Sequence, residues 1–365
     1  MRKTASRLMT GVVALLVAET GRVAGHVDYV TDPVEGGDAV PFLLEVFANP
    51  LNVLLLGGGG VSVVVVAATY LYVRPARRDI AVFRAVMDDY RDLLPWLLRL
   101  SFGLPLVGAG FAGYLFSPSV ALEAVAVPGR LFQITVGFLL LFGLATRVAA
   151  AMALFVYLVG AVSLPELALA NEYVPGLIAI FLLGSGRPSA DHVLERLASA
   201  EKTIYGELDP VYRVSAWFNR AVDPYEIYVP TVVRAGLGFN FVFLGITQKL
   251  LSPDRALAVI GKYDLTAVVP VDAGLWVVGA GLTEAALGMA LVVGLFTRAG
   301  SLVALTIFTL TLFGLPDDPV LAHITLFGLA SLLLITGPGP FALDGALRDR
   351  VEARRGEPQA ASADP

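Results

Sequence analysis

The sequence predicts an all-α protein, a polytopic bundle of transmembrane helices, and two observations point to this fold class. Of the 365 residues, 56% are hydrophobic and 16% are charged, whereas about a quarter of the residues in a soluble domain are charged. The hydrophobic residues also come in blocks of roughly 17 to 25, the length that a helix needs to cross a bilayer. With a mean hydropathy of +0.75, the chain is expected to have the lipid bilayer as its main partner.

The composition also excludes several kinds of chemistry. There are no cysteines, which excludes disulfides, thiolate metal sites and cysteine nucleophiles together. The net charge of -5 comes from loops and tails and indicates no nucleic-acid partner. The sequence contains no P-loop, dinucleotide fingerprint or nucleophile elbow.

The N-terminal residues 1–25 are typical of a secretory signal peptide, with a basic start, an apolar core at 8–18 and small residues at 23–25. Cleavage there would make His26 the new N-terminus. The alternative is an uncleaved first anchor, but the apolar core is short for a span. Residues 26–50 contain no Lys or Arg, which predicts an extracytoplasmic segment.

The first predicted span is residues 51–73, and arginines follow it directly. Arginines gather on the cytoplasmic side of membranes, so we expect residues 74–94 to be cytoplasmic. This segment is charged and amphipathic, as in a helix that lies on the membrane surface. The glycine run Gly57–Gly60 inside the span is expected to allow close packing with another helix.

Two four-helix repeats are expected after this first helix. In the first repeat, residues 95–195, the predicted spans are 96–116, 129–145, 148–164 and 174–186. In the second repeat, residues 229–345, they are 229–251, 271–296, 299–315 and 320–337. The interfacial linker 196–228 and the tail 346–365 contain basic residues and are expected to be cytoplasmic. After signal cleavage the chain would cross the plasma membrane about nine times, with its N-terminus outside and its C-terminus in the cytoplasm.

Matched residues indicate that the two repeats arose by duplication. The matched pairs are Arg99 with Arg234, Gly103 with Gly238, Gly110 with Gly245, Gly137 with Gly288, Gly143 with Gly294, Arg147 with Arg298, Gly184 with Gly337, Gly186 with Gly339, and Asp191 with Asp344. Each copy has an even number of spans, so the copies would be parallel rather than inverted.

Three stretches of the second repeat carry a family resemblance. They are GITQKL at 245–250, GLFTR at 294–298 and TGPGPFALD at 336–344. Together with the arginine-glycine entry of the first span, they resemble the DoxX/DoxD family of small four-helix membrane proteins. The first repeat is a degenerate copy, in which Tyr114 stands where the second repeat has Lys249.

The resemblance implies a membrane component of a quinone-linked redox system. Some members of the family are subunits of thiosulfate:quinone oxidoreductase, and others are linked to quinone or redox-stress handling. The implied ligand is a membrane quinone. The sequence suggests no intrinsic cofactor, so electron transfer would need the quinone or a soluble or membrane-bound partner subunit. The alternative is a non-catalytic scaffold or a small-solute transporter, in which polar residues only join the helices.

Glu284 is the clearest candidate for chemistry, because it lies mid-span between apolar residues. A charge inside the bilayer costs roughly 2.5–3.5 kcal/mol on insertion scales. Asn240 is expected at the same depth on the preceding span, so a buried Glu284–Asn240 hydrogen bond is one reading. The other is a carboxyl that exchanges a proton with a bound headgroup. The matching residue of the first repeat, Gln133, suits packing but not proton transfer.

The remaining candidates are predicted to form a polar pocket near the outer leaflet. Lys249, Gln248 and His323 are expected at one depth above Glu284, where they would act on or bind a headgroup. Taken singly, Lys249 also suits snorkelling to water, and His323 suits a hydrogen bond between helices.

The other candidate binding residues have simpler readings. Asn240 and Arg234 are the further candidates for contact with a quinone or lipid headgroup, and Arg234 also suits an anchor at the inner membrane surface. No metal site is predicted. A free His26 N-terminus could chelate copper, but a second imidazole within reach is missing.

Overall fold

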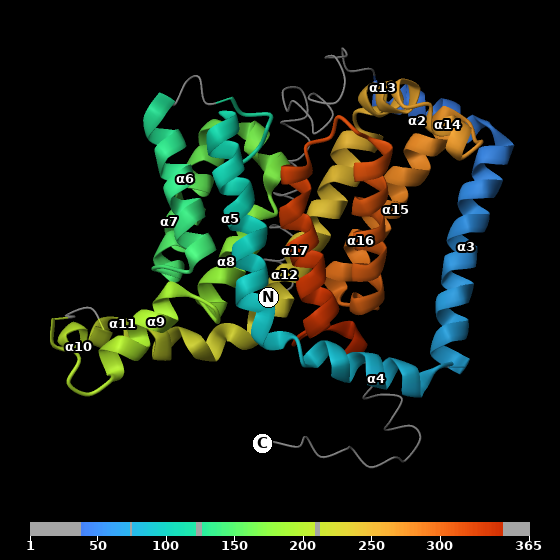
Figure 1. Cartoon of the computed structure of the whole chain (residues 1–365). Coiled ribbons are helices and arrows are strands. Elements are labelled where there is room, and N and C mark those ends of the chain that lie inside the picture. The colour runs from blue at the N-terminus through green and yellow to red at the C-terminus, as the bar shows by residue number, and fades with distance from the viewer. Residues whose placement is uncertain (1–37, 74, 122–125, 209–211, 346–365) are drawn as a thin grey trace, which may run out of the picture.

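The computed structural model describes residues 38–73, 75–121, 126–208 and 212–345 (Figure 1). The structure is all-α and 82% helical, and the described residues form no strand. The predicted signal peptide, His26 and the C-terminal tail 346–365 lie outside the described residues.

Six helices of the described chain are long and apolar enough to cross a membrane. They are α3 (Pro50–Val73), α5 (Leu94–Ala112), α7 (Thr146–Ser163), α12 (Val229–Leu244) with its continuation η5 (Gly245–Leu250), α15 (Ala273–Val293) and α16 (Thr297–Gly314). Three shorter apolar helices coincide with the other predicted spans, namely α6 (Ala126–Phe142), α8 (Tyr173–Leu183) and α17 (Val320–Thr336). Each of the nine predicted spans therefore coincides with a helix.

Surface helices lie at the two ends of the bundle (Figure 1). One end, called here the α4 end, carries α4 (Arg77–Asp88), α9 (Ala190–Ser199), α10 (Ile204–Leu208), α11 (Tyr212–Val222) and η4 (Asp223–Tyr228). The opposite end, the α13 end, carries α2 (Ala39–Ala48), α13 (Pro253–Lys262) and α14 (Leu265–Val268). The described helices of the segments 74–94 and 196–228, both segments being expected in the cytoplasm, thus lie at the same end.

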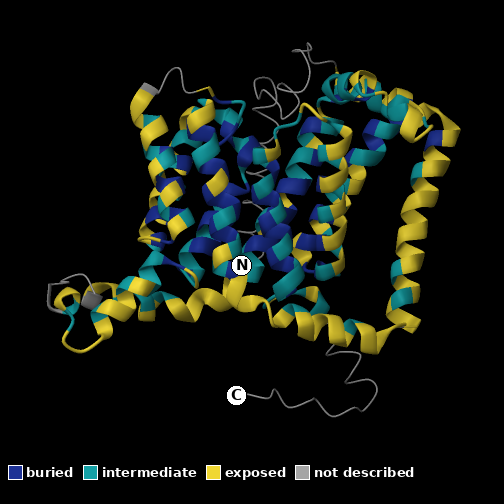
Figure 2. Cartoon of the chain, in the orientation of Figure 1, coloured by how far each residue is buried: buried dark blue, intermediate teal, exposed yellow. Residues whose placement is uncertain are grey.

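The helix α3 stands at the edge of the molecule and is exposed along most of its length (Figure 2). Only 6% of its most apolar stretch is buried. A Cβ atom added at any position of Gly57–Gly60 would meet nothing within 4 Å. Contrary to the prediction of close packing, no helix among the described residues packs against these glycines.

Glycines allow the closest helix pairs of the bundle, α5 with α6 and α12 with α15, to touch backbone to backbone. A Cβ added to Gly103 would lie 2.9 Å from the carbonyl oxygen of Gly137, and one added to Gly238 would lie 2.6 Å from that of Gly288. Both distances are shorter than real Cβ contacts, so alanine does not fit without a shift of the helices. Small residues at such crossings are typical of helix pairs in membranes.

Two aspartates close matching turns at the α4 end. Asp191 accepts hydrogen bonds from the backbone N–H groups of Ala145 and Thr146, at 2.7 and 3.0 Å. Asp344 accepts from the two corresponding N–H groups at the start of α16, at 2.8 and 3.1 Å. Because the first N–H groups of a helix have no partner within the helix, these carboxylates cap α7 and α16 from a distant part of the chain.

Two arginines attach surface helices to the bundle in matching ways. The Arg147 guanidinium donates to a carbonyl oxygen in the last turn of α8 at 3.0 Å and to Asp223 at 2.8 Å. The Arg298 guanidinium donates to a carbonyl oxygen in the last turn of α17 at 2.8 Å and to Asp88 at 3.1 Å. Each arginine thus satisfies a helix C-terminus and holds a surface helix against it.

Candidate functional site

Lys249 and Glu284 form an ion pair between η5 and α15. The Lys249 Nζ atom lies 2.7 Å from Glu284 Oε2, and the two side chains are 26% and 16% exposed. Pairing offsets part of the cost of placing either charge in hydrocarbon. The structure thus brings together two of the three residues expected to act on a ligand. The Lys249 amine is paired with a mid-helix carboxyl, which replaces the snorkelling alternative.

The local backbone explains why the pair can form. Gly245 and Gly281 bring η5 and α15 into close contact, since a Cβ on Gly245 would lie 2.8 Å from the Gly281 carbonyl oxygen. The segment Gly245–Leu250 is a π-helix, a rare, wider turn that often occurs at functional sites. Lys249 lies in this turn, so its position relative to α12 differs from that in a regular α-helix.

Gln248, which directly precedes Lys249 in the chain, has a buried side-chain oxygen without a hydrogen-bond partner among the described residues. Its side chain is 5% exposed, and its Nε2 atom donates to Thr247 Oγ1 at 3.4 Å. The Oε1 atom is buried and has no hydrogen-bond partner among the described residues. Most buried polar atoms are hydrogen-bonded, so this oxygen keeps its capacity to accept a hydrogen bond.

His323 is placed differently from the prediction. Its Nε2 atom lies 3.5 Å from Asp318 Oδ2 in the loop before α17, and its ring packs edge-on against Phe308. Burial raises the pKa of Asp318, and the nearby His323 opposes this rise. Of the four residues predicted to form a pocket, the structure joins Lys249 to Glu284 by an ion pair, and Gln248 precedes Lys249 in the chain.

Asn240 and Arg234 also have partners other than those expected. Asn240 donates to Glu172 Oε2 at 3.5 Å and not to Glu284, which corrects the predicted Glu284–Asn240 bond. Arg234 is 3% exposed and donates to the carbonyl oxygens of Pro338 and Phe341 at 2.9 and 3.0 Å. Arg234 therefore holds the segment after α17 against α12, and little of its guanidinium is left for a headgroup.

The first repeat has only neutral contacts at the place of the ion pair. Gln133, which matches Glu284, is fully buried. Its Oε1 atom accepts from the backbone N–H of Phe116 at 3.1 Å, and its Nε2 atom donates to the carbonyl oxygen of Tyr114 at 3.1 Å. The helix α5 ends at Ala112, before the position of Tyr114, whereas η5 continues through Lys249. The first repeat thus closes with a turn where the second presents a charged pair.

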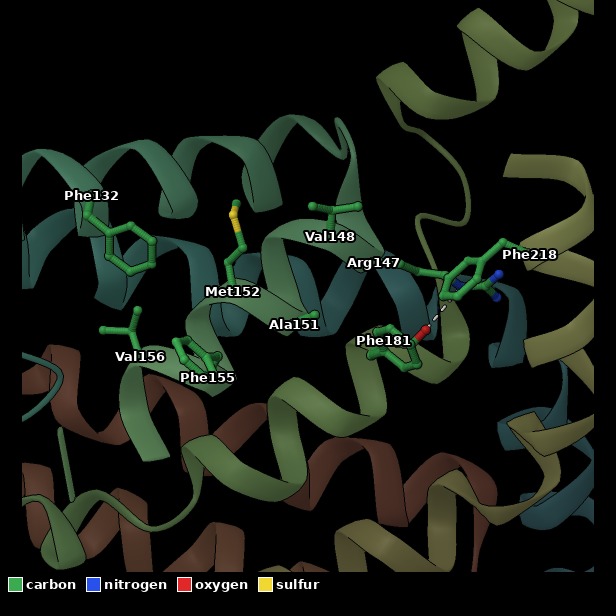
Figure 3. Close-up of a pocket in the computed structure, with 9 residues that line it drawn as sticks. All are labelled: Phe132, Arg147, Val148, Ala151, Met152, Phe155, Val156, Phe181 and Phe218. Atoms are coloured by element: carbon green, nitrogen blue, oxygen red, sulfur yellow. Dashed lines mark hydrogen bonds between the residues drawn. The ribbon is translucent and has the colours of Figure 1, made fainter. Parts of the chain in front are cut away.

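A groove of about 500 Å³ lies in the first repeat, away from the ion pair (Figure 3). It is lined almost entirely by apolar side chains of α6, α7, α8 and α11, with Arg147 at one end. The Arg147 guanidinium already donates to Asn219 and Asp223 as well as to two carbonyl oxygens of α8. This groove can hold an apolar chain, but it offers little for recognising a polar headgroup.

Sequence reasoning missed Glu172, which is 5% exposed and lies between the two halves of the bundle. Residue 172 falls between the predicted spans 148–164 and 174–186, so it was not expected inside the bundle. The alignment of Gly184 with Gly337 contained the signal, since the same offset places Glu172 opposite Thr325, inside a predicted span.

The described residues contain no group of three or more His, Cys, Asp or Glu side chains that could hold a metal ion. His26, the candidate copper ligand, lies outside the described part. The apolar helices define a polytopic helical membrane protein. Comparison of the chain with models of protein families, with curated proteins and with solved structures finds no match.

Proposed function

We propose that this membrane protein binds a quinone, or a similar small lipophilic molecule with a polar headgroup, at the Lys249–Glu284 pair. It would do so as a DoxX-like component of a quinone-linked redox system. One observation carries this proposal: a partly exposed ion pair inside membrane helices has a buried, unpaired Gln248 oxygen next to it in the chain.

The chemistry of the three side chains suits a quinone headgroup. The Lys249 ammonium can donate to a quinone carbonyl oxygen, and the Gln248 Oε1 atom can accept from the hydroxyl of the reduced quinol. Glu284 can exchange a proton with that hydroxyl. Electrons would come from or pass to a partner subunit, since the sequence suggests no intrinsic redox group.

The proposed architecture places this site in the second of two tandem parallel four-helix repeats. The first repeat is α5 to α8 and the second is α12 to α17, with α3 as the extra N-terminal helix. Support comes from contacts that recur at the aligned positions of both halves. These are the close helix contacts at glycines, the aspartates that cap a helix N-terminus, and the arginines that donate to a helix C-terminus. The proposed orientation has the α4 end in the cytoplasm, which follows from the arginines gathered there.

The test is the quinone content of the purified protein. Wild type would be extracted from the membrane in a mild detergent, and its bound quinone quantified by liquid chromatography and mass spectrometry per mole of protein. The double variant Lys249→Met/Glu284→Gln should lose at least about 90% of it, because it removes both the ammonium donor and the carboxylate. A tenfold loss of affinity corresponds to a loss of about 1.4 kcal/mol of binding free energy. The matched control Tyr114→Phe, at the aligned position of the first repeat, should retain it. Equal quinone in wild type and the double variant would refute the site.

A scaffold function is the second candidate, and the exposure of α3 favours it. Gly57–Gly60 have no packing partner among the described residues, although such glycines commonly receive a neighbouring helix. On this reading a partner membrane protein covers α3 and the ion pair only joins two helices. A stoichiometric partner that co-purifies without any bound quinone would select this function.

A further inference from the structure

Glu172 is a buried carboxyl that the proposed quinone site does not use. It follows the 3-10 helix η3 (Pro165–Ala170) and directly precedes α8. Its two side-chain hydrogen-bond partners both come from the other half of the bundle, Asn240 on α12 and Thr325 on α17. These two residues are 2% and 1% exposed, so the carboxyl lies inside the contact between the halves.

The partners of Glu172 are neutral and distant for a charged group. Thr325 Oγ1 lies 3.3 Å from Glu172 Oε1, and Asn240 Nδ2 lies 3.5 Å from Oε2. Charge-assisted hydrogen bonds are usually shorter, about 2.7–2.9 Å. No Lys, Arg or His among the described residues forms an ion pair with Glu172. A bare carboxylate here would thus be poorly compensated.

The Thr325 hydroxyl is placed to accept a hydrogen from Glu172. It has one hydrogen and two lone pairs, and it lies 3.3 Å from the carbonyl oxygen of Ala322 as well as 3.3 Å from Glu172. When its single hydrogen is donated to that carbonyl, its lone pair can accept one from the carboxylic acid of Glu172. The geometry therefore suits the protonated form of the side chain.

The titratable groups that face Glu172 are tyrosines. Tyr157 on α7, Tyr173 at the start of α8 and Tyr114 after α5 surround this region. The Tyr157 hydroxyl donates to a backbone carbonyl oxygen at 2.7 Å. The neighbouring helices α12 and α17 present Asn240 and Thr325 to the carboxyl as hydrogen-bond partners. None of these side chains supplies a positive charge, so only a small cation could neutralise Glu172.

A narrow opening leads towards Glu172 from the α13 end. Its lining includes Glu172, Tyr114, Ser117 and Pro118, and its volume is about 10 Å³. A cavity needs roughly 10–15 Å³ to hold one water molecule. The opening is therefore large enough for a single water that carries a proton, and too small for a hydrated metal ion. Tyr114 and Pro118 are partly exposed, which places the opening near the surface.

We propose that Glu172 is a proton-binding site between the two halves of the bundle, in exchange with water at the α13 end through the opening beside Tyr114. Loss of the proton leaves a negative charge between α8, α12 and α17, and this charge weakens the contact between the halves. Proton binding is thereby linked to their packing. Glu172 shares no hydrogen-bond partner with the Lys249–Glu284 pair, and the proposal does not depend on a ligand there.

The test is infrared difference spectroscopy of the purified full-length protein, recorded while the pH is raised. A protonated buried carboxyl gives its own carbonyl band, which shifts in heavy water and disappears on deprotonation. Wild type should lose one such band at alkaline pH, and Glu172→Gln should lack that band. The matched control Glu166→Gln, which removes a carboxyl of η3 that has no such contacts, should retain it.

Two results would overturn the proposal. One is the absence of any such band from wild type at all pH values, and the other is its persistence in Glu172→Gln. If Glu172→Gln does not fold, as judged by size-exclusion chromatography, the same spectra of Thr325→Val test the proposal. This variant keeps the carboxyl but removes its hydroxyl partner, so the band should move in frequency, and an unmoved band contradicts the assignment.

Discussion

Replacing one residue of the Lys249–Glu284 pair by a neutral residue should destabilise the protein more than replacing both. Lys249→Met leaves the Glu284 carboxylate alone in the membrane, where an isolated charge costs roughly 2.5–3.5 kcal/mol. Because the side chains are 26% and 16% exposed, water relieves a small part of this cost. We therefore expect each single variant to lose about 2–3 kcal/mol. The double variant Lys249→Met/Glu284→Gln should lose less than about 1.5 kcal/mol, since isosteric neutral replacements of a buried pair are often nearly neutral.

The assay is the free energy of unfolding in detergent micelles, measured by titration with a denaturing detergent and followed by circular dichroism. The surface pair Lys262–Asp317 is a matched control, because its nitrogen and oxygen are also 2.7 Å apart but its side chains are 41% and 55% exposed. Lys262→Met should cause no measurable change. A double variant as unstable as the sum of the two single variants would show that Lys249 and Glu284 do not interact, and the site would lose its geometric basis.

Three further predictions concern topology and packing. Single cysteines at Ser199 and Asp38 should react with impermeant maleimide from the cytoplasmic and the outer face respectively, and the reverse pattern would invert the proposed orientation. N-terminal sequencing of the membrane-inserted protein should begin at His26, and recovery of residues 1–25 would show an uncleaved anchor. Gly288→Ala should lower the melting temperature, because its Cβ would meet the backbone of α12, at a cost of about 1–3 kcal/mol for an overpacked contact. Gly58→Ala should not, since a Cβ there meets nothing within 4 Å; equal losses at both glycines would contradict the described helix contacts.

Residue patterns predicted the helices well because the bilayer leaves little choice of backbone structure. The predicted spans coincide with helices, and the aligned glycines Gly143 and Gly294 both adopt positive φ, +64° and +72°, where glycine is favoured. The sequence did not predict that the aspartates aligned at 191 and 344 cap the third helix of each half. That contact joins residues about 45 positions apart in the chain, and a single sequence does not show which distant residues meet in the fold.

The site was predicted less well, for two physical reasons. A regular helix was assumed through residue 250, whereas the π-turn at Gly245–Leu250 changes the face on which Lys249 lies by about the rotation of one residue, ~100°. The partner expected for Glu284 was Asn240, which lies before this turn, but its carboxylate is paired with Lys249. Glu172 was missed because the loop that carries it folds back between helices, which local composition cannot reveal.

The most direct test of the proposed ligand site is photolabelling with a quinone headgroup that carries an azide, followed by peptide mass spectrometry. The account predicts crosslinks in η5 and α15, around Lys249 and Glu284, that an excess of unlabelled quinone abolishes. Crosslinks confined to the apolar groove around Met152 and Phe155, or no crosslinks that unlabelled quinone competes away, would contradict it.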